Sequence, residues 1–268
     1  MKISVSNIAW GKNNFNKFLS LIKENGCDGV ELAPSLLWDE PKNITTKEIN
    51  KLKNLLNKYN LALTGFHSLL FNRPDLLIFN EKTREESIEY LLMLIDICSE
   101  LDGKQIVFGS PRNRVLCNKS LSECKKQAEE DIFRISEYGK KKNVIFCLEP
   151  LSKVETEFMT SIDEGGEFVS KINHLFFKLH IDTKAIYQTK EDPDTVITKY
   201  KNIIQHVHIG DKGLSEPGTH NMNHKEIGKA LQKINYKNYL SLEIKSNDKD
   251  LENTIIRSIN FIKKNYIH

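Results

Sequence analysis

Two patterns of hydrophobic and polar positions, one typical of strands and one typical of helices, alternate along this chain. Short apolar runs, typical of buried strands, recur over its whole length. We expect eight strands, near residues 2–8, 28–33, 61–67, 104–109, 143–149, 176–182, 203–209 and 239–245. Between them lie stretches in which apolar residues return every three or four positions, as in amphipathic helices. The sequence therefore predicts strands and helices in alternation.

This alternation predicts an α/β fold with a parallel sheet, because strand–helix–strand units are right-handed and place consecutive strands in parallel. Two helices have clear starts, since Thr45 with Glu48 and Ser120 with Glu123 have the spacing of a capping box. Eight units close most naturally into a (β/α)8 TIM barrel, expected as one domain over residues 1–268. An open doubly wound sheet is the alternative, which the absence of a glycine-rich phosphate loop after the first strand disfavours.

Composition narrows the choice of partners. The chain has 39 Lys and Arg residues against 36 Asp and Glu residues, a formal net charge of +3, which does not indicate a nucleic-acid-binding protein. Five cysteines without a CxxC pair argue against a disulfide framework or a zinc knuckle. The start of the chain does not resemble a signal peptide, and no apolar run reaches the roughly 18 residues that span a bilayer. We expect a soluble, cytoplasmic protein that binds neither membranes nor nucleic acid.

Four polar side chains stand at or near the ends of four consecutive predicted strands. They are Glu149, Asp182, His208 and Glu243. Each alone is more often a helix cap or a hydrogen-bonded core residue. In a barrel, however, the carboxyl ends of all strands meet at one face, so four such residues can share one ion. Three carboxylates and one imidazole favour Mn²⁺, Mg²⁺, Co²⁺ or Zn²⁺. His180 and His206, two residues earlier on their strands, are expected to lie deeper and to support the site.

Short motifs on the predicted strands carry a family resemblance. They are SNIAW, GVELAPSLLW, IVFGSPRNR, CLEP, LHIDT, HVHIG and SLEI, in this order along the chain. In these the whole chain resembles the xylose-isomerase-like TIM barrels. It resembles in particular the sugar phosphate isomerase/epimerase group, which includes the ketose 3-epimerases and is similar in fold to endonuclease IV.

The resemblance implies an isomerase that uses a bound divalent metal, Mn²⁺ before Mg²⁺, Co²⁺ or Zn²⁺. It implies that Glu149, Asp182, His208 and Glu243 hold the metal. Glu149 and Glu243 would also act as catalytic acid and base on opposite faces of a sugar. Such an enzyme removes a proton next to a carbonyl and leaves an enediolate, whose charge the metal stabilises. Epimerisation and aldose–ketose isomerisation both follow this scheme.

The chain departs from the ketose 3-epimerases where those enzymes bind substrate. Ala185 replaces an expected histidine, and Leu214 replaces an expected arginine. Other groups near the strand ends are therefore our candidates for binding a carbohydrate, with or without an anionic group. These candidates are His67, Arg112, Arg114, Lys184 and Trp10. Cationic side chains of this kind suit a phosphate or carboxylate.

Two other functions remain open. One is a metal-dependent phosphodiesterase like endonuclease IV, which would use several metals and additional histidines, among them His67, His220 and His224. The other is a sugar-binding barrel without catalysis, against which the presence of both Glu149 and Glu243 argues. The sequence leaves open the sugar, the reacting carbon, the metal and whether the chain forms a homo-oligomer.

Overall fold

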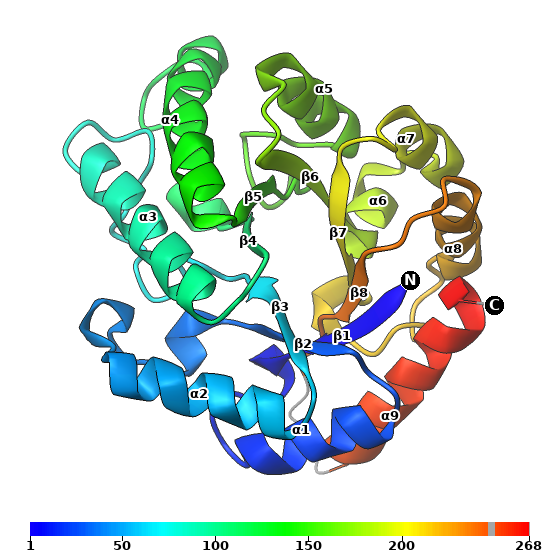
Figure 1. The fold of residues 1–268 in the computed structure, drawn as a ribbon. Coiled ribbons are helices and arrows are strands. Elements are labelled where there is room, and N and C mark those ends of the chain that lie inside the picture. The colour runs from blue at the N-terminus through cyan, green and yellow to red at the C-terminus, as the bar shows by residue number, and fades with distance from the viewer. Residues whose placement is uncertain (246–249, 268) are drawn as a thin grey trace.

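The computed structural model describes residues 1–245 and 250–267, and this part of the chain forms a closed barrel of eight parallel strands (Figure 1). The strands are β1 (Lys2–Ser6), β2 (Gly29–Leu32), β3 (Ala62–Phe66), β4 (Gln105–Phe108), β5 (Ile145–Leu148), β6 (Phe177–Asp182), β7 (Ile204–Ile209) and β8 (Tyr239–Leu242). They pair in chain order, and β8 closes on β1. The predicted TIM barrel is confirmed, and the open doubly wound sheet is wrong. The expected domain range includes residues 246–249 and 268, which lie outside the described residues.

Helices surround the barrel as an outer ring (Figure 1). They are α1 (Phe15–Glu24), α2 (Thr46–Lys58), α3 (Arg84–Glu100), α4 (Leu121–Lys142), α5 (Ile162–Ile172), α6 (Thr183–Thr189), α7 (Pro193–Lys199), α8 (His224–Lys233) and α9 (Leu251–Ile262). Two short helices, α6 and α7, together connect β6 to β7. Within the described residues, no helix is long and apolar enough to cross a membrane.

Local sequence signals set the observed boundaries. Every strand begins within two residues of its predicted start. Both predicted capping boxes are present: the Thr45 side chain accepts a hydrogen bond from the Glu48 backbone, and Ser120 does the same for Glu123. These side chains satisfy amide groups that would otherwise lack a partner in the first helical turn.

Parallel pairing in register places polar side chains from neighbouring strands at the same height in the barrel. Asp182 of β6 pairs with His208 of β7, which in turn pairs with Ser241 of β8. One level deeper, His180 pairs with His206. All five of these residues are buried. The barrel thus concentrates titratable groups beneath the carboxyl ends of β6, β7 and β8.

Candidate active site

The structure brings the four predicted strand-end residues to the same face of the barrel. Glu149 and Glu243 directly follow β5 and β8, Asp182 ends β6, and His208 is the second-last residue of β7. Asp182, His208 and Glu243 are buried, and only 12% of the Glu149 side chain is exposed. The site has two parts with different contacts.

One part, which we call the histidine side, consists of Glu31, His67, His208 and Glu243. Glu243 accepts contacts from two imidazoles: Nδ1 of His67 lies 3.1 Å from Oε1, and Nδ1 of His208 lies 3.3 Å from Oε2. The other ring nitrogen of His67, Nε2, lies 2.5 Å from the Ser6 hydroxyl. Glu243 and both imidazoles are therefore held in fixed orientations.

Glu31 of β2 is a member of this group that the sequence analysis did not identify. Its side chain is fully buried and accepts a hydrogen bond of 2.6 Å from the Ser241 hydroxyl. His208 Nε2 lies 2.9 Å from its Oε2, and His206 Nε2 lies 3.0 Å from its Oε1. The only signal in the sequence is an acidic residue within the apolar run of a strand, because buried charges are rare unless they are paired.

Electrostatic interactions on the histidine side favour charged groups despite burial. Burial alone would raise the pKa of Glu31, but the neighbouring His208 and His206 outweigh it and hold this pKa well below its usual range. In Glu243, likewise, His208 and His67 outweigh burial and lower the pKa. The pKa of His208 is raised well above its usual value, because Glu31 and Glu243 outweigh the effect of burial. Glu31 and Glu243 are thus ionised at neutral pH.

The other part, which we call the lysine side, consists of Glu149, Asp182, Lys184 and Glu155. The backbone amide of Lys184 donates a 2.8 Å hydrogen bond to Asp182 Oδ1. Its ammonium group lies 3.5 Å from Asp182 Oδ2 and 3.2 Å from Glu155 Oε1. The sequence analysis did not identify Glu155, which lies in the loop after β5, because nothing at its own position distinguishes it from a solvated loop residue.

Carboxylate charge is less well compensated on the lysine side. Burial, and then the nearby Asp182, raise the pKa of Glu149 to about 8. Burial also raises the pKa of Asp182, although Lys184 opposes this effect. Gly109 allows Glu149 to pack closely, because a Cβ atom at position 109 would lie 2.0 Å from Glu149 Oε2. At neutral pH Glu149 is therefore mainly protonated, in contrast to Glu243.

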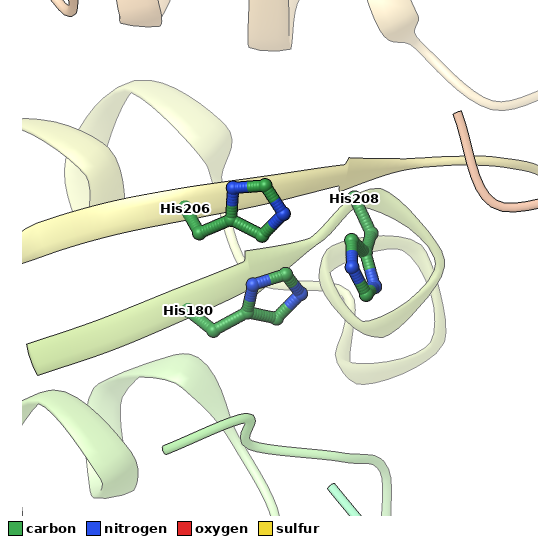
Figure 2. Close-up of side chains that lie close together, drawn as sticks. All are labelled: His180, His206 and His208. Atoms are coloured by element: carbon green, nitrogen blue, oxygen red, sulfur yellow. The ribbon is translucent and has the colours of Figure 1, made fainter. Parts of the chain in front are cut away.

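Three histidines lie close together on two neighbouring strands, His180 on β6 and His206 and His208 on β7 (Figure 2). Their ring nitrogens are close enough together to hold a metal ion. In His206 and His208, however, Nε2 already faces Glu31. The two nitrogens of His180 form no hydrogen bond within the described residues, and Nε2 lies 3.9 Å from Glu149 Oε1. His180 and His206 thus lie deeper than the strand ends, as predicted.

The residues at the strand ends fit a divalent metal. Asp182 Oδ2 and His208 Nδ1 are both buried and form no hydrogen bond within the described residues. His67, His208 and Glu243 also have nitrogen and oxygen atoms close enough together for one ion. A set of carboxylate oxygens with one or two imidazole nitrogens suits a hard or borderline cation.

The candidate substrate residues lie in different environments. Arg112 is exposed in the turn that follows β4. Arg114, two residues later, is fully buried and donates a 3.0 Å hydrogen bond from Nη1 to the Glu149 carbonyl oxygen. Burial lowers the pKa of Arg114 to about 10. Trp10 is buried and stacks on Phe18 at 5.1 Å between ring centroids. Of these three side chains, only Arg112 is exposed to solvent.

Two histidines that a multi-metal site would need, the buried His224 and the exposed His220, instead contact a second cluster around the buried Asp211. Both ring nitrogens of His224 form hydrogen bonds. Nε2 lies 2.6 Å from Asp211 Oδ1, and Nδ1 lies 2.6 Å from the Tyr266 hydroxyl. Asp211 also accepts a 2.7 Å hydrogen bond from the backbone amide of His220. The His220 ring contacts the hydroxyl of Ser215 at 3.2 Å. These contacts hold the segment between β7 and α8 in place.

Comparison with known proteins agrees with the fold. The family described as Xylose isomerase-like TIM barrel matches residues 19–265. The chain is 20% identical over 261 residues to a 3-dehydro-D-guloside 4-epimerase of Escherichia coli K12, covering 91% of this chain and 92% of that protein. It is 22% identical to a D-psicose 3-epimerase of Enterocloster bolteae, covering 91% and 82% of the two chains.

A solved structure has the same architecture over its full length. The D-psicose 3-epimerase of Clostridium cellulolyticum H10, determined with D-tagatose, superposes with a TM-score of 0.85 at 18% identity and covers 99% of both chains. At this identity the superposition is evidence for the fold alone. Together with the match over residues 19–265, it leads to one conclusion: the chain belongs to the xylose isomerase-like TIM barrel family.

Proposed function

We propose that this protein is a divalent-metal-dependent epimerase or isomerase of keto-sugars that transfers a proton at a carbon next to a carbonyl. The observation that carries the proposal is the position of two glutamates, Glu149 and Glu243, which directly follow β5 and β8 at one barrel mouth that also holds Asp182 and His208. Glu149 has its pKa raised to about 8 by burial and Asp182, whereas Glu243 has its pKa lowered well below the usual range. Two-base proton transfer needs two carboxyl groups at one substrate, one to accept the proton and one to donate it.

The chain's own residues account for the two proton transfers. Glu243 accepts the proton from the substrate carbon, and the imidazoles of His67 and His208 fix its orientation. Glu149, which gives up its own proton when the metal binds, takes up a proton from solvent and donates it to the carbon on the opposite face. The two residues exchange roles in the reverse direction. Asp182 and His208, together with both glutamates, would hold the metal. When bound, the metal polarises the carbonyl group and stabilises the negative charge that develops on its oxygen.

The names of the relatives agree with this chemistry. One relative is named a D-psicose 3-epimerase and another a 3-dehydro-D-guloside 4-epimerase. In both names the carbon that is inverted lies next to a carbonyl carbon. We therefore propose a free or glycosidic keto-sugar as the substrate. Arg112 and Lys184 are the groups through which an anionic substituent would be recognised.

Incubation with a panel of keto-sugars and sugar phosphates in D2O tests the reaction. The protein, loaded with Mn²⁺, is mixed with D-psicose, D-tagatose, D-fructose, L-ribulose and 3-keto-glycosides, and the products are analysed by mass spectrometry. We expect one solvent deuterium at the reacting carbon of an epimer or isomer. A protein that retains full metal and converts no member of the panel would contradict the proposed substrate class.

Metal content tests the proposed ligands independently of turnover. Asp182→Ala and His208→Ala each remove a donor from a site with few donors, so both should purify with much less metal than wild type. The control is Asp211→Ala, which removes a buried carboxylate outside the site. A single metal per wild-type chain also separates this proposal from a phosphodiesterase with several metals. Full occupancy in both ligand variants would refute the ligand assignment.

A further inference from the structure

We propose that Glu31 is the positioning residue of the site, which fixes the ring of His208 so that Nε2 carries a proton and Nδ1 faces the mouth of the barrel. This inference rests on the proposed metal site and adds a residue to it. Glu31 belongs to β2, on the far side of β1 and β8 from His208, so its side chain reaches across the barrel interior to β7.

The contacts of Glu31 leave His208 one orientation. Oε2 lies 2.9 Å from His208 Nε2, and a carboxylate can only accept a hydrogen bond, so Nε2 must carry a proton. Nδ1 lies 3.3 Å from Glu243 Oε2, so in the metal-free protein it carries a proton as well, and it would give up this proton to bind a metal beside Glu243. A histidine that binds a metal commonly donates its other N–H group to a carboxylate, which fixes the ring and makes it a better ligand.

Neighbouring side chains contact both carboxylate oxygens of Glu31 and so hold its orientation. Ser241 donates to Oε2 at 2.6 Å, and His206 Nε2 lies 3.0 Å from Oε1. Oε2 therefore accepts contacts from neighbours on two strands, and the carboxylate plane cannot rotate without losing one of them. His180 has no such contact with Glu31, although it lies beside His206 and His208 (Figure 2). The three histidines are thus better explained as support for His208 than as a separate metal site.

Glu31→Gln tests the inference, because an amide has nearly the same shape but provides only one acceptor oxygen and no charge. We expect its affinity for Mn²⁺, measured by competition with a fluorescent chelator, to fall about 10- to 100-fold. Ser241→Ala keeps the carboxylate and removes one of its donors, so it should weaken Mn²⁺ binding by a few-fold only. The milder variant provides a second test if Glu31→Gln does not fold.

Asp211→Asn is the matched control. Asp211 is equally buried and also contacts a histidine, His224, but it lies outside the proposed ligand set. Its substitution should lower thermal stability and leave Mn²⁺ affinity unchanged. An equal loss of affinity in Asp211→Asn and Glu31→Gln would mean that any damage to the barrel interior has this effect, and would overturn the specific role of Glu31.

Nitrogen-15 NMR of the histidine rings, recorded without metal, separates this inference from the proposed function. We expect a slowly exchanging proton on His208 Nε2 in the wild type, and its loss in Glu31→Gln. If the wild type binds no metal, the proposed function fails, and this signal still decides the role of Glu31. A folded Glu31→Gln with wild-type Mn²⁺ affinity and an unchanged His208 signal would overturn the inference.

Discussion

The histidine side and the lysine side of the barrel mouth provide carboxylates of opposite character. On the histidine side, Glu243 is held by two imidazoles and has a lowered pKa. On the lysine side, Glu149 is buried next to Asp182 and has a raised pKa. Both glutamates follow a strand by one residue, so position in the fold does not distinguish them. The neighbours that each strand brings decide which carboxyl group has the raised pKa and which has the lowered pKa.

The largest effect is expected from replacing either glutamate with glutamine. Glu149→Gln and Glu243→Gln keep the size of the side chain but cannot transfer a proton, so each should lower turnover roughly a hundredfold or more. The measurement is the steady-state rate on the substrate found in the D2O experiment. Glu226→Gln on α8 is the control, since Glu226 is exposed and lies in the first turn of an outer helix. Near-normal turnover in both site variants would exclude two-base proton transfer.

The raised pKa of Glu149 predicts how the stability of the metal-free protein depends on pH. The folded-state pKa of about 8 lies above the ordinary value of 4.5, so in this range the folded protein binds a proton that the unfolded chain has lost. Stability should therefore fall as pH rises from about 4.5 to about 8. Thermal unfolding at several pH values measures this, and Glu149→Gln should lose less stability over the range. Identical pH profiles would contradict the raised pKa.

Lys184 should weaken metal binding, because its ammonium group lies 3.5 Å from Asp182 Oδ2. Lys184→Met keeps much of the side-chain volume and removes the charge. We expect it to bind Mn²⁺ roughly tenfold more tightly, since a like charge close to the metal is lost. Lys212→Met is the matched control, because Lys212 is an exposed residue in the loop after β7. Weaker Mn²⁺ binding by Lys184→Met would show that the ammonium group organises the site instead of competing with the metal.

The smallest effect is expected at Arg112, which is exposed after β4. If the substrate is anionic, Arg112→Ala should raise KM a few-fold and leave kcat nearly unchanged, since it removes binding energy shared by the ground and transition states. Arg134→Ala is the control, because Arg134 lies on α4 and pairs with Glu85. An unchanged KM would assign Arg112 to the solvated surface.

The sequence was sufficient to predict the barrel and the strand-end residues. A chain with eight apolar runs between amphipathic helices is compatible with few fold topologies. In the barrel, the carboxyl ends of all strands lie at one face. Thus Glu149, Asp182, His208 and Glu243 could be named as one group before any contact was known. Glu31 could not, because it lies within a strand, and its contact with His208 depends on closure of the barrel.

The environments of loop residues were harder to predict. Arg112 and Arg114 stand in the same turn after β4, but only the second folds inward and donates to the Glu149 carbonyl oxygen. Glu155, in the loop after β5, pairs with Lys184 in the first turn of α6. Neither the depth of Arg114 nor this ion pair follows from a periodic pattern, because loop conformation depends on tertiary packing.

Proton release on metal binding is the most direct test of the difference between the two sides. Titration calorimetry with Mn²⁺ at pH 7, repeated in buffers of different ionisation enthalpy, gives the number of protons released per metal. Metal binding requires a deprotonated ligand, so the wild type should release about one proton more than Glu149→Gln. Glu243→Gln removes no proton of its own, since Glu243 is already ionised, and it should change the number only through the pKa of His208, which Glu243 raises. Equal proton release by the wild type and Glu149→Gln would contradict the assignment of Glu149 as the protonated carboxyl group.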